Sequence, residues 1–308
     1  MNNRVAVMDL GTNTFHLLIA ERSSTDFIEI VREQVAVKLG EGGINKGFIQ
    51  PAPFERGIGA MQRFDELIEK HNVQQVRAIA TSALRNAANG QDFIDDVMAK
   101  TGIVIEIIDG DIEAAFIYKG IKSGGILSKQ NSLIVDIGGG SAEFIICNDA
   151  EILWKQSFEI GAARLMDLFH RTDPIPPESN DALNLYLEDC LRNLITAASA
   201  YTIDDMIGSS GVFESYAEIM EWTKGIPFDP KKIKHYAFDH DELLALIERI
   251  VLSTHQERLI TKGIIPIRID MIVTASLLTR FVIEKLGIGK VLMSTNSLKE
   301  GVLAEMMG

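Results

Sequence analysis

Acidic residues and glycines stand together in residues 133–146. There an apolar stretch meets an aspartate, three consecutive glycines and a serine, and a second apolar stretch follows. This order predicts a strand, a tight turn and another strand. Without Cβ atoms, the turn's backbone N–H groups can approach an anion closely. Carboxylates on both sides of bound phosphate are the ligands that a hydrated Mg²⁺ ion needs. A flexible glycine hairpin with two solvated acids explains this stretch alone equally well. The residues concerned are Asp136, Gly138, Gly139, Gly140, Ser141 and Glu143.

A second copy of this plan lies near the start of the chain, in residues 4–20. Asp-Leu-Gly-Thr-Asn-Thr at 9–14 matches Asp-Ile-Gly-Gly-Gly-Ser at 136–141. Asp9 then corresponds to the first acid, and Asn13 and Thr14 to the polar end of the turn. Such long-range similarity predicts two related lobes. Two turns facing each other across a cleft could hold one phosphate chain.

Two further candidates follow predicted strands of the first lobe, where open α/β sheets bind ligands. Thr81 offers a hydroxyl, and Arg85 offers a guanidinium fork suited to phosphate. A helix start with a solvated arginine is the favoured reading of that segment taken alone. Glu113 falls in the first turn of a helix, where an acid favours the helix dipole. Facing the cleft, it would be a general base for water attacking phosphorus.

The second lobe offers two similar candidates. Ser209 and Ser210 lie between glycines at a predicted helix start, which is either an anion site or an ordinary strand-to-helix turn. Arg164, just inside a helix, could contact phosphate or have no such role.

Hydrophobic periodicity supplies the elements that would position these residues. The first lobe shows a third strand after the first hairpin and then alternating strands and helices, which predicts a layered α/β domain. The second lobe repeats this order with added helices. The predicted ranges are strands at 27–39, 76–80, 103–108, 151–158, 205–208 and 289–293, helices at 51–71, 92–100, 111–121, 181–201, 239–259, 269–286 and 296–307, another helix opening at 161–165, and a loop at 172–180.

Composition sets the broad class of protein. The chain has 308 residues, 46% of them hydrophobic, which suffices for two domains. Its net charge of −13 argues against nonspecific nucleic-acid binding. An anion site here must therefore use backbone amides, a few local cations and a metal. Two cysteines, no signal-peptide pattern and no long apolar run predict a cytoplasmic protein that is not bound to membranes.

Other motifs are missing from the sequence. It has no P-loop and no nucleophilic serine or cysteine pattern. The six histidines lack metal-ligand spacing, and His235 and His240 stand in a polar stretch.

In combination, these segments resemble the exopolyphosphatase and guanosine pentaphosphate phosphatase (Ppx/GppA) family, within the superfamily of sugar kinases, chaperone ATPases and actin. The resemblance covers nearly the whole chain in order: 9–14, 80–85, 110–114, 136–143, 161–165, 208–211, 268–270 and 294–301. It implies an α/β fold of two ribonuclease H-like (actin-like ATPase) lobes around a central cleft. The lobes would span 1–123 and 124–308, and the last helix could pack back on the first lobe.

The resemblance also implies the roles of residues. Glu113 would activate water, and Arg85 would neutralise charge developing during phosphoryl transfer. Mg²⁺ would be held through waters by Asp136 and Glu143, with Asp9 as a further metal candidate. The terminal phosphate would be bound at both turns, by Asn13, Thr14, Gly138, Gly139, Gly140 and Ser141, with Thr81, Ser209 and Ser210 as further candidates. A homodimer is the expectation at family level.

Some positions depart from the family pattern. Ile112 replaces an acid and Ala115 an arginine beside the presumed base. Longer members also carry a further C-terminal helical domain that this sequence does not include. Both differences weaken the expected grip on long polyphosphate, and they favour short polyphosphate or guanosine pentaphosphate (pppGpp).

The sequence therefore predicts an acid-anhydride hydrolase that is Mg²⁺-dependent and releases terminal phosphate from polyphosphate or pppGpp. A non-catalytic regulator that binds (p)ppGpp or another nucleotide is the alternative, motivated by Ile112 and Ala115. A kinase or ATPase of the superfamily is a third hypothesis, disfavoured because Glu113 suits water activation.

Overall fold

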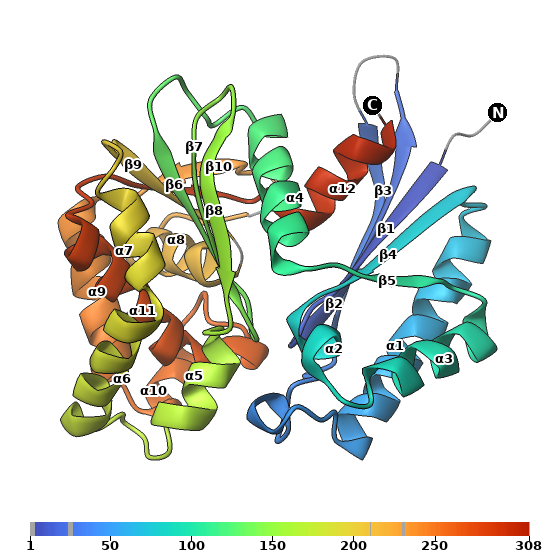
Figure 1. Cartoon of the computed structure of the whole chain (residues 1–308), viewed down its shortest axis with the longest axis horizontal. Coiled ribbons are helices and arrows are strands. Elements are labelled where there is room, and N and C mark those ends of the chain that lie inside the picture. The colour runs from blue at the N-terminus through green and yellow to red at the C-terminus, as the bar shows by residue number, and fades with distance from the viewer. Residues whose placement is uncertain (1–3, 24–26, 210, 230–231, 308) are drawn as a thin grey trace. The chain divides into compact units, whose positions relative to one another are not determined.

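A computed structural model of the chain describes residues 4–23, 27–209, 211–229 and 232–307. The chain forms two compact units (Figure 1). Unit 1 comprises Met1–Gly120 with Leu298–Gly308, and unit 2 comprises Ile121–Ser297. The sequence analysis placed the boundary between the lobes after residue 123, whereas unit 1 ends at Gly120 in the structure. The last helix of the chain belongs to unit 1.

Unit 1 is built on a five-stranded mixed sheet in the order β3-β2-β1-β4-β5. β1 pairs antiparallel with β2 and parallel with β4, and β4 pairs parallel with β5. The carboxyl ends of β1, β4 and β5 therefore lie at one edge of the sheet. The elements are β1 (Arg4–Leu10), β2 (Thr14–Arg22), β3 (Phe27–Ala36), the short 3-10 helix η1 (Ile44–Lys46), α1 (Pro51–Lys70), β4 (Gln75–Ala80), α2 (Ser82–Asn86), α3 (Gly90–Thr101), β5 (Ile105–Ile107), α4 (Gly110–Ser123) and α12 (Leu298–Met307).

The core of unit 1 lies between the sheet and the helices α1 and α3. Ile58, Met61 and Phe64 recur at helical spacing on α1 and pack with Met8 of β1 and Phe93 of α3. In Figure 1, α12 lies on the other face of this sheet. Both faces of β1 are therefore covered, which explains its nearly continuous apolar sequence.

The C-terminal helix α12 is tied into unit 1 by charge pairs and a close backbone contact. Glu300, 2% exposed, accepts two hydrogen bonds of 3.1 Å from the guanidinium of Arg32 on β3. Glu305 accepts hydrogen bonds from Lys119 and Arg77, which hold its pKa below the usual value. At Gly301, an added Cβ would stand 1.9 Å from the Phe116 carbonyl oxygen, so only glycine allows this helix crossing.

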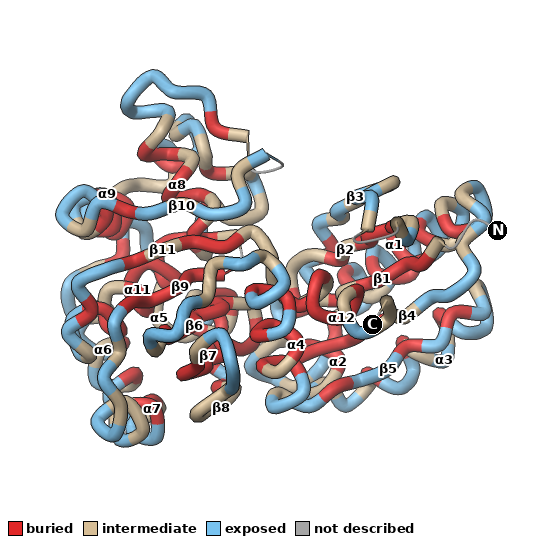
Figure 2. Tube along the Cα trace, turned by 90° about the horizontal axis from the view of Figure 1, so that it is seen from above, coloured by how far each residue is buried: buried red, intermediate tan, exposed pale blue. Residues whose placement is uncertain are grey.

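Unit 2 carries a six-stranded mixed sheet in the order β10-β11-β9-β6-β7-β8. β6 and β9 are buried along their length (Figure 2). The helical layer packs on the face that presents Leu133, Val135 and Phe144. The elements are β6 (Ser132–Ile137), β7 (Ala142–Cys147), β8 (Ile152–Phe158), α5 (Ala162–Phe169), α6 (Pro177–Cys190), α7 (Arg192–Ala198), β9 (Asp205–Ser209), α8 (Gly211–Thr223), β10 (His235–Ala237), α9 (His240–Leu252), α10 (His255–Ile260), the short 3-10 helix η2 (Pro266–Arg268), α11 (Met271–Leu286) and β11 (Val291–Ser294).

The two sheets confirm the predicted α/β class with two ribonuclease H-like lobes. The cleft between the lobes stays a prediction. No helix among the described residues is both long and apolar enough to cross a membrane.

Two predicted helices of unit 2 were wrong in extent, and one strand was missed. The helix expected over 239–259 is two helices, because Thr254 starts α10 with a capping box: its hydroxyl accepts from the Glu257 N–H, and the Glu257 carboxylate accepts from the Thr254 N–H. The helix expected over 181–201 begins earlier, with Pro177 in its first turn, and is interrupted at Leu191, so the loop expected over 172–180 is also shorter than predicted. The edge strand β10 was not predicted, because its short sequence is polar and largely exposed.

One buried arginine organises the region between α5 and α11. Arg258 is 1% exposed, and its guanidinium donates to the Ile269 carbonyl at 2.6 Å, the Ser253 carbonyl at 2.5 Å and the Asp173 carboxylate at 2.5 Å. Burial alone would raise the pKa of Asp173. The hydrogen bonds from Arg258 and the His255 backbone, with the charge of Arg258, hold the pKa of Asp173 below its usual value.

Replacing this arginine should lower stability in a pH-dependent way. We expect Arg258→Met to lower the free energy of unfolding by about 3 kcal/mol at pH 7, because the substitution leaves buried acceptors and a carboxylate without the guanidinium donor. The Asp173 contribution is present above its unfolded pKa of about 3.9 and is lost as the pH falls through its lower folded pKa. The difference in the free energy of unfolding between variant and wild type should therefore become smaller at acidic pH. Urea titrations from pH 7 to pH 3 measure this.

The matched control is Arg192→Met. Arg192 is 75% exposed and pairs with an exposed Asp189, so we expect a change below about 0.5 kcal/mol at any pH. Equal losses in the two variants would contradict the role assigned to Arg258.

Candidate active site

The turn between β1 and β2 in unit 1 is held by the segment that leaves β3. The Lys38 N–H donates to the Asn13 carbonyl at 2.8 Å, and the Gly40 N–H donates to the Thr12 carbonyl at 3.1 Å. In a planar trans peptide, the N–H points away from the preceding carbonyl. The N–H groups of Asn13 and Thr14 therefore point away from segment 38–40. Amides oriented in this way can bind an anion.

Thr81 lies at the same sheet edge, directly after β4. Leu10 pairs with Ala80 in the parallel register, so the turn after β1 and the residues after β4 are neighbours. Thr81 is 5% exposed and precedes α2, the helix that carries Arg85 in its last turn. The structure thus brings Asn13, Thr14, Thr81 and Arg85 to one end of one sheet.

Arg85 forms an ion pair with Glu113. Its Nη1 donates to Glu113 Oε2 at 3.0 Å and to the Ile108 carbonyl at 3.0 Å. The two side chains are 17% and 8% exposed. The guanidinium stabilises negative charge on the carboxylate, and a carboxylate is the form of glutamate that can accept a proton. The predicted base and the predicted charge-neutralising residue therefore touch each other, a contact that the sequence analysis did not anticipate.

Helix α4 fixes Glu113 at the sheet edge. The preceding Ile108 N–H bonds to the Ala80 carbonyl, which ties the strand end to β4. Asp109 then starts the helix, since its side chain accepts from the Ile112 N–H at 2.8 Å and its carbonyl accepts from the Glu113 N–H at 3.0 Å. The acid thus sits in a first turn in which the amides of Ile112 and Glu113 are bonded to Asp109.

The triple-glycine turn of unit 2 is held in the same manner by the start of α5. The Ala162 N–H donates to the Gly138 carbonyl at 2.9 Å, the Ala163 N–H to the Gly139 carbonyl at 2.9 Å, and the Gly161 N–H to the Gly140 carbonyl at 3.1 Å. These bonds satisfy the helix's first amides. By the same peptide-plane geometry, the N–H groups of Gly139, Gly140 and Ser141 point away from α5.

Gly161 permits this contact. A Cβ at this position would lie 2.4 Å from the carbonyl carbon of Gly139 and 2.5 Å from that of Gly140. Arg164 adds a side-chain contact between α5 and the turn. Its Nε donates to the Gly140 carbonyl at 3.1 Å, and its Nη2 pairs with Glu159 at 2.8 Å. The structure thus gives Arg164 a contact with the turn's backbone, a role the sequence analysis did not consider.

The predicted metal ligands of unit 2 are neighbours. Asp136 and Glu143 face each other in the antiparallel register of β6 and β7, so both side chains lie on one sheet face. They are 7% and 2% exposed. Ser209, paired with Asp136 in the parallel register, donates to its Oδ2 at 2.8 Å, and Ser157 donates to Glu143 Oε1 at 2.7 Å. Ser210 lies outside the described residues.

This donor set fits a hydrated Mg²⁺ ion. Two buried carboxylates directly opposite each other repel, and a bound cation would relieve that repulsion. Serine hydroxyls fix the orientation of both carboxylates, as groups around a metal's ligands commonly do. The described residues contain no group of three or more His, Cys, Asp or Glu that could hold a metal ion. Asp9 belongs to unit 1. In the strand register it lies opposite His16 of β2 and Ile79 of β4.

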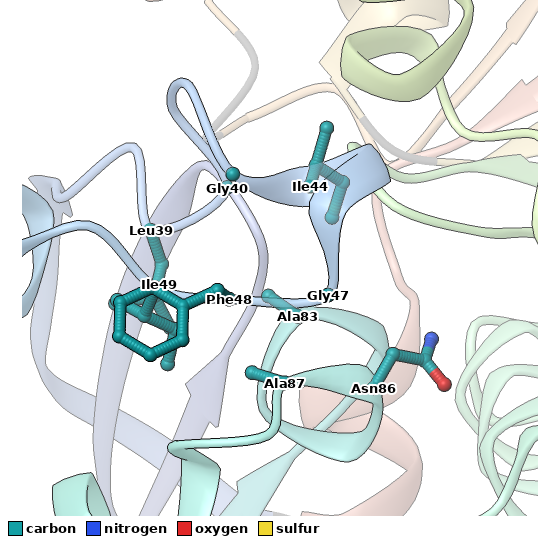
Figure 3. A pocket seen from close by; sticks show the side chains of 10 residues that line it. Leu39, Gly40, Ile44, Gly47, Phe48, Ile49, Ala83, Asn86 and Ala87 are labelled. Atoms are coloured by element: carbon teal, nitrogen blue, oxygen red, sulfur yellow. The ribbon is translucent and has the colours of Figure 1, made fainter.

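A small hollow adjoins the turn of unit 1 (Figure 3). It is lined by residues of loop 39–49 and by Ala83, Asn86 and Ala87. Its interior volume is about 10 Å³. That is room for roughly one water molecule, so the hollow as it stands cannot hold a nucleobase.

Sequence reasoning missed the residues that hold the turns. Gly161 was predicted only to open a helix, although a glycine between a strand and a helix is a signal for close backbone approach. Nothing in the sequence marked Ser157 or Lys38 as partners of the site.

Comparisons with known proteins agree with this fold. A crystal structure of an exopolyphosphatase from Cytophaga hutchinsonii matches with a TM-score of 0.96, covering 99% of this chain and 98% of that one at 39% identity. The crystal structure of the Aquifex aeolicus Ppx/GppA family member matches in fold, with a TM-score of 0.82 at 23% identity over 99% of this chain and 98% of that one.

Among sequence relatives, a putative exopolyphosphatase from Haemophilus influenzae is 26% identical over 299 residues, covering 97% of this chain and 90% of that protein. A guanosine-5'-triphosphate,3'-diphosphate pyrophosphatase from Vibrio campbellii is 27% identical over 307 residues, covering 98% of this chain but 59% of that protein. The fold and the similarity to these proteins identify the class of this chain, which is that of a phosphohydrolase. The chain belongs to the Ppx/GppA phosphatase family, whose family model matches residues 18–308.

Proposed function

We propose that this phosphohydrolase is Mg²⁺-dependent and releases terminal phosphate from inorganic polyphosphate or pppGpp. The observation that carries the proposal is the Arg85–Glu113 pair at the sheet edge that also bears the Asn13 turn. A nearly buried carboxylate at the same sheet edge as amides suited to phosphate favours hydrolysis of a phosphoanhydride. The names of the two sequence relatives refer to polyphosphate in one case and to pppGpp in the other, so both substrates stay in the proposal.

In the proposed reaction, a water oxygen attacks the terminal phosphorus and the bridging P–O bond breaks. Glu113 takes the proton released by the water, and the shortened chain leaves with the bridging oxygen. Arg85 stabilises negative charge that builds up in the transition state. Catalysis consists mainly of positioning and charge stabilisation, as is usual for phosphoryl transfer.

The turn amides bind phosphate oxygens in this proposal. Asn13 and Thr14 contribute them in unit 1, and Gly139, Gly140 and Ser141 contribute them in unit 2. Asp136 and Glu143 would hold Mg²⁺, which when bound supplies positive charge against the phosphate oxygens. Ser157 and Ser209 keep those carboxylates in place.

A substrate panel tests the proposal. Short polyphosphate, long polyphosphate, pppGpp and ATP are compared at fixed Mg²⁺ by measuring released phosphate. We expect release from polyphosphate or pppGpp at least about tenfold faster than from ATP, and loss of release with EDTA. Tight nucleotide binding in calorimetry without any release would overturn hydrolysis in favour of a regulator. Phosphate transfer from ATP to an acceptor would indicate a kinase.

A further inference from the structure

Four polar residues form one row across four neighbouring strands of unit 2. The sheet order places β9, β6, β7 and β8 side by side (Figure 1). In the parallel register, Ser209 lies beside Asp136. Across the antiparallel pairs, Glu143 lies opposite both Asp136 and Ser157. Residues that are paired in register point to the same face of a sheet, so the two acids stand in the middle of the row with a serine on each side.

Each serine donates a hydrogen bond to one oxygen of the acid beside it. The bond from Ser209 to Asp136 Oδ2 is 2.8 Å long, and the bond from Ser157 to Glu143 Oε1 is 2.7 Å long. The terminal torsion of an acidic side chain has a broad distribution, so it does not fix the carboxylate by itself. A hydrogen bond to a defined oxygen restricts that rotation. The acids are 7% and 2% exposed, so bulk water can hardly replace these bonds.

The two common divalent cations make different demands on such carboxylates. Mg²⁺ needs nearly ideal octahedral geometry, keeps several waters and is held by one or two carboxylates. Ca²⁺ takes more oxygen ligands in a flexible arrangement, and it often binds both oxygens of one carboxylate. A carboxylate with restricted rotation and one oxygen bonded to a serine suits Mg²⁺ better. For Ca²⁺ to bind both oxygens, it must compete with the hydroxyl or turn the carboxylate.

We propose that Ser157 is a specificity-determining residue for the metal ion. With Ser209, it makes the pair of Asp136 and Glu143 select Mg²⁺ over Ca²⁺. Each serine acts through the carboxylate that it orients, and neither is itself a ligand. This inference rests on the proposed function, since it concerns the metal ion of the same site. It adds that β8, an edge strand that carries neither acid, controls which ion is bound.

Three variants separate the hydroxyl from other effects. Ser157→Ala removes the hydroxyl that bonds to Glu143. Ser157→Thr keeps a hydroxyl and adds a methyl group, which strands accept well. Ser132→Ala is the matched control, because it removes a buried hydroxyl at the other end of β6.

Mn²⁺ is the probe, because it favours the same oxygen ligands and octahedral geometry as Mg²⁺. Its binding to the full chain is followed by electron paramagnetic resonance, and Mg²⁺ or Ca²⁺ is added as the competitor. The measured quantity is the ratio of the Ca²⁺ dissociation constant to the Mg²⁺ dissociation constant. No substrate turnover enters this measurement.

In the wild type, Mg²⁺ should displace Mn²⁺ at a lower concentration than Ca²⁺ does. For Ser157→Ala we expect Mg²⁺ to bind about tenfold more weakly, as is usual when the partner of a metal ligand is lost. Ca²⁺ affinity should change by less than about twofold, because a freely rotating carboxylate suits that ion. The ratio should therefore fall about fivefold or more. Ser157→Thr and Ser132→Ala should keep the ratio within about twofold of wild type.

An unchanged ratio in Ser157→Ala would overturn the proposal, whether both affinities stay the same or both fall. An equal fall of the ratio in Ser132→Ala would also overturn it, since that indicates a general loosening of the sheet. A wild type that binds Ca²⁺ as tightly as Mg²⁺ would contradict the selectivity itself. A wild type that binds no Mn²⁺ would instead reject the metal site of the proposed function, and this inference with it.

Discussion

Glu113→Gln should lower phosphate release by about 10²–10⁴-fold, the usual contribution of a positioned general base. The amide oxygen of glutamine can still accept the hydrogen bond from Arg85, so the side chain should keep its place. The amide cannot take a proton from water. The loss should therefore fall on kcat, with KM within a fewfold of wild type, as expected for an interaction made in the transition state. Malachite-green assays under saturating substrate measure it.

The control for this variant is Glu106→Gln. It makes the same change on β5, where Glu106 forms an exposed pair with Arg77, and activity should stay within about twofold. Full activity in Glu113→Gln would remove Glu113 from the mechanism and leave the family's hydrolytic step without the base proposed here.

Gly161→Ala should lower kcat/KM by about a hundredfold or more, comparable to the loss of a charge-stabilising donor group. The new methyl would lie 2.4 Å from Gly139 and 2.5 Å from Gly140, against backbone atoms that cannot rotate away. Either the turn or α5 must shift, and the turn amides then lose their orientation. Overpacking of this kind also costs about 1–3 kcal/mol of stability. Kinetics and urea denaturation on the same preparation record both effects.

Gly59→Ala provides the comparison. Gly59 lies on α1, and a Cβ added there would have nothing within 4 Å, so alanine should stabilise the helix by up to about 1 kcal/mol and leave activity unchanged. Wild-type activity in Gly161→Ala would show that the close backbone contact between the start of α5 and the glycine turn is not needed for activity.

The sequence allowed the two turns to be located because each combines glycine, an acid and flanking apolar strands within a few residues. Signals within such a short stretch do not depend on how distant segments of the chain pack together. The ion pair of Arg85 with Glu113 joins residues 28 apart in sequence, and it depends on which strands become neighbours. Periodicity predicts that strands exist but does not fix such distances between their ends.

The errors in the helices have a similar origin. The apolar spacing of 239–259 runs through Ser253 and Thr254, so periodicity alone joins two helices that a capping box separates. The position of Gly161 signals a close backbone approach, but the turn that it meets lies more than twenty residues earlier, and no pattern within either segment reveals which two segments meet.

The return of α12 to unit 1 has a consequence for biosynthesis. Arg32, Phe116 and Arg77 leave the ribosome long before their partners on α12 do, because the whole of unit 2 is translated in between. Unit 2 is contiguous in sequence, but its sheet needs β11, which ends only shortly before α12 begins. Neither unit can therefore complete its core until nearly the whole chain has been translated, which departs from the usual N-terminal-first order of domain folding.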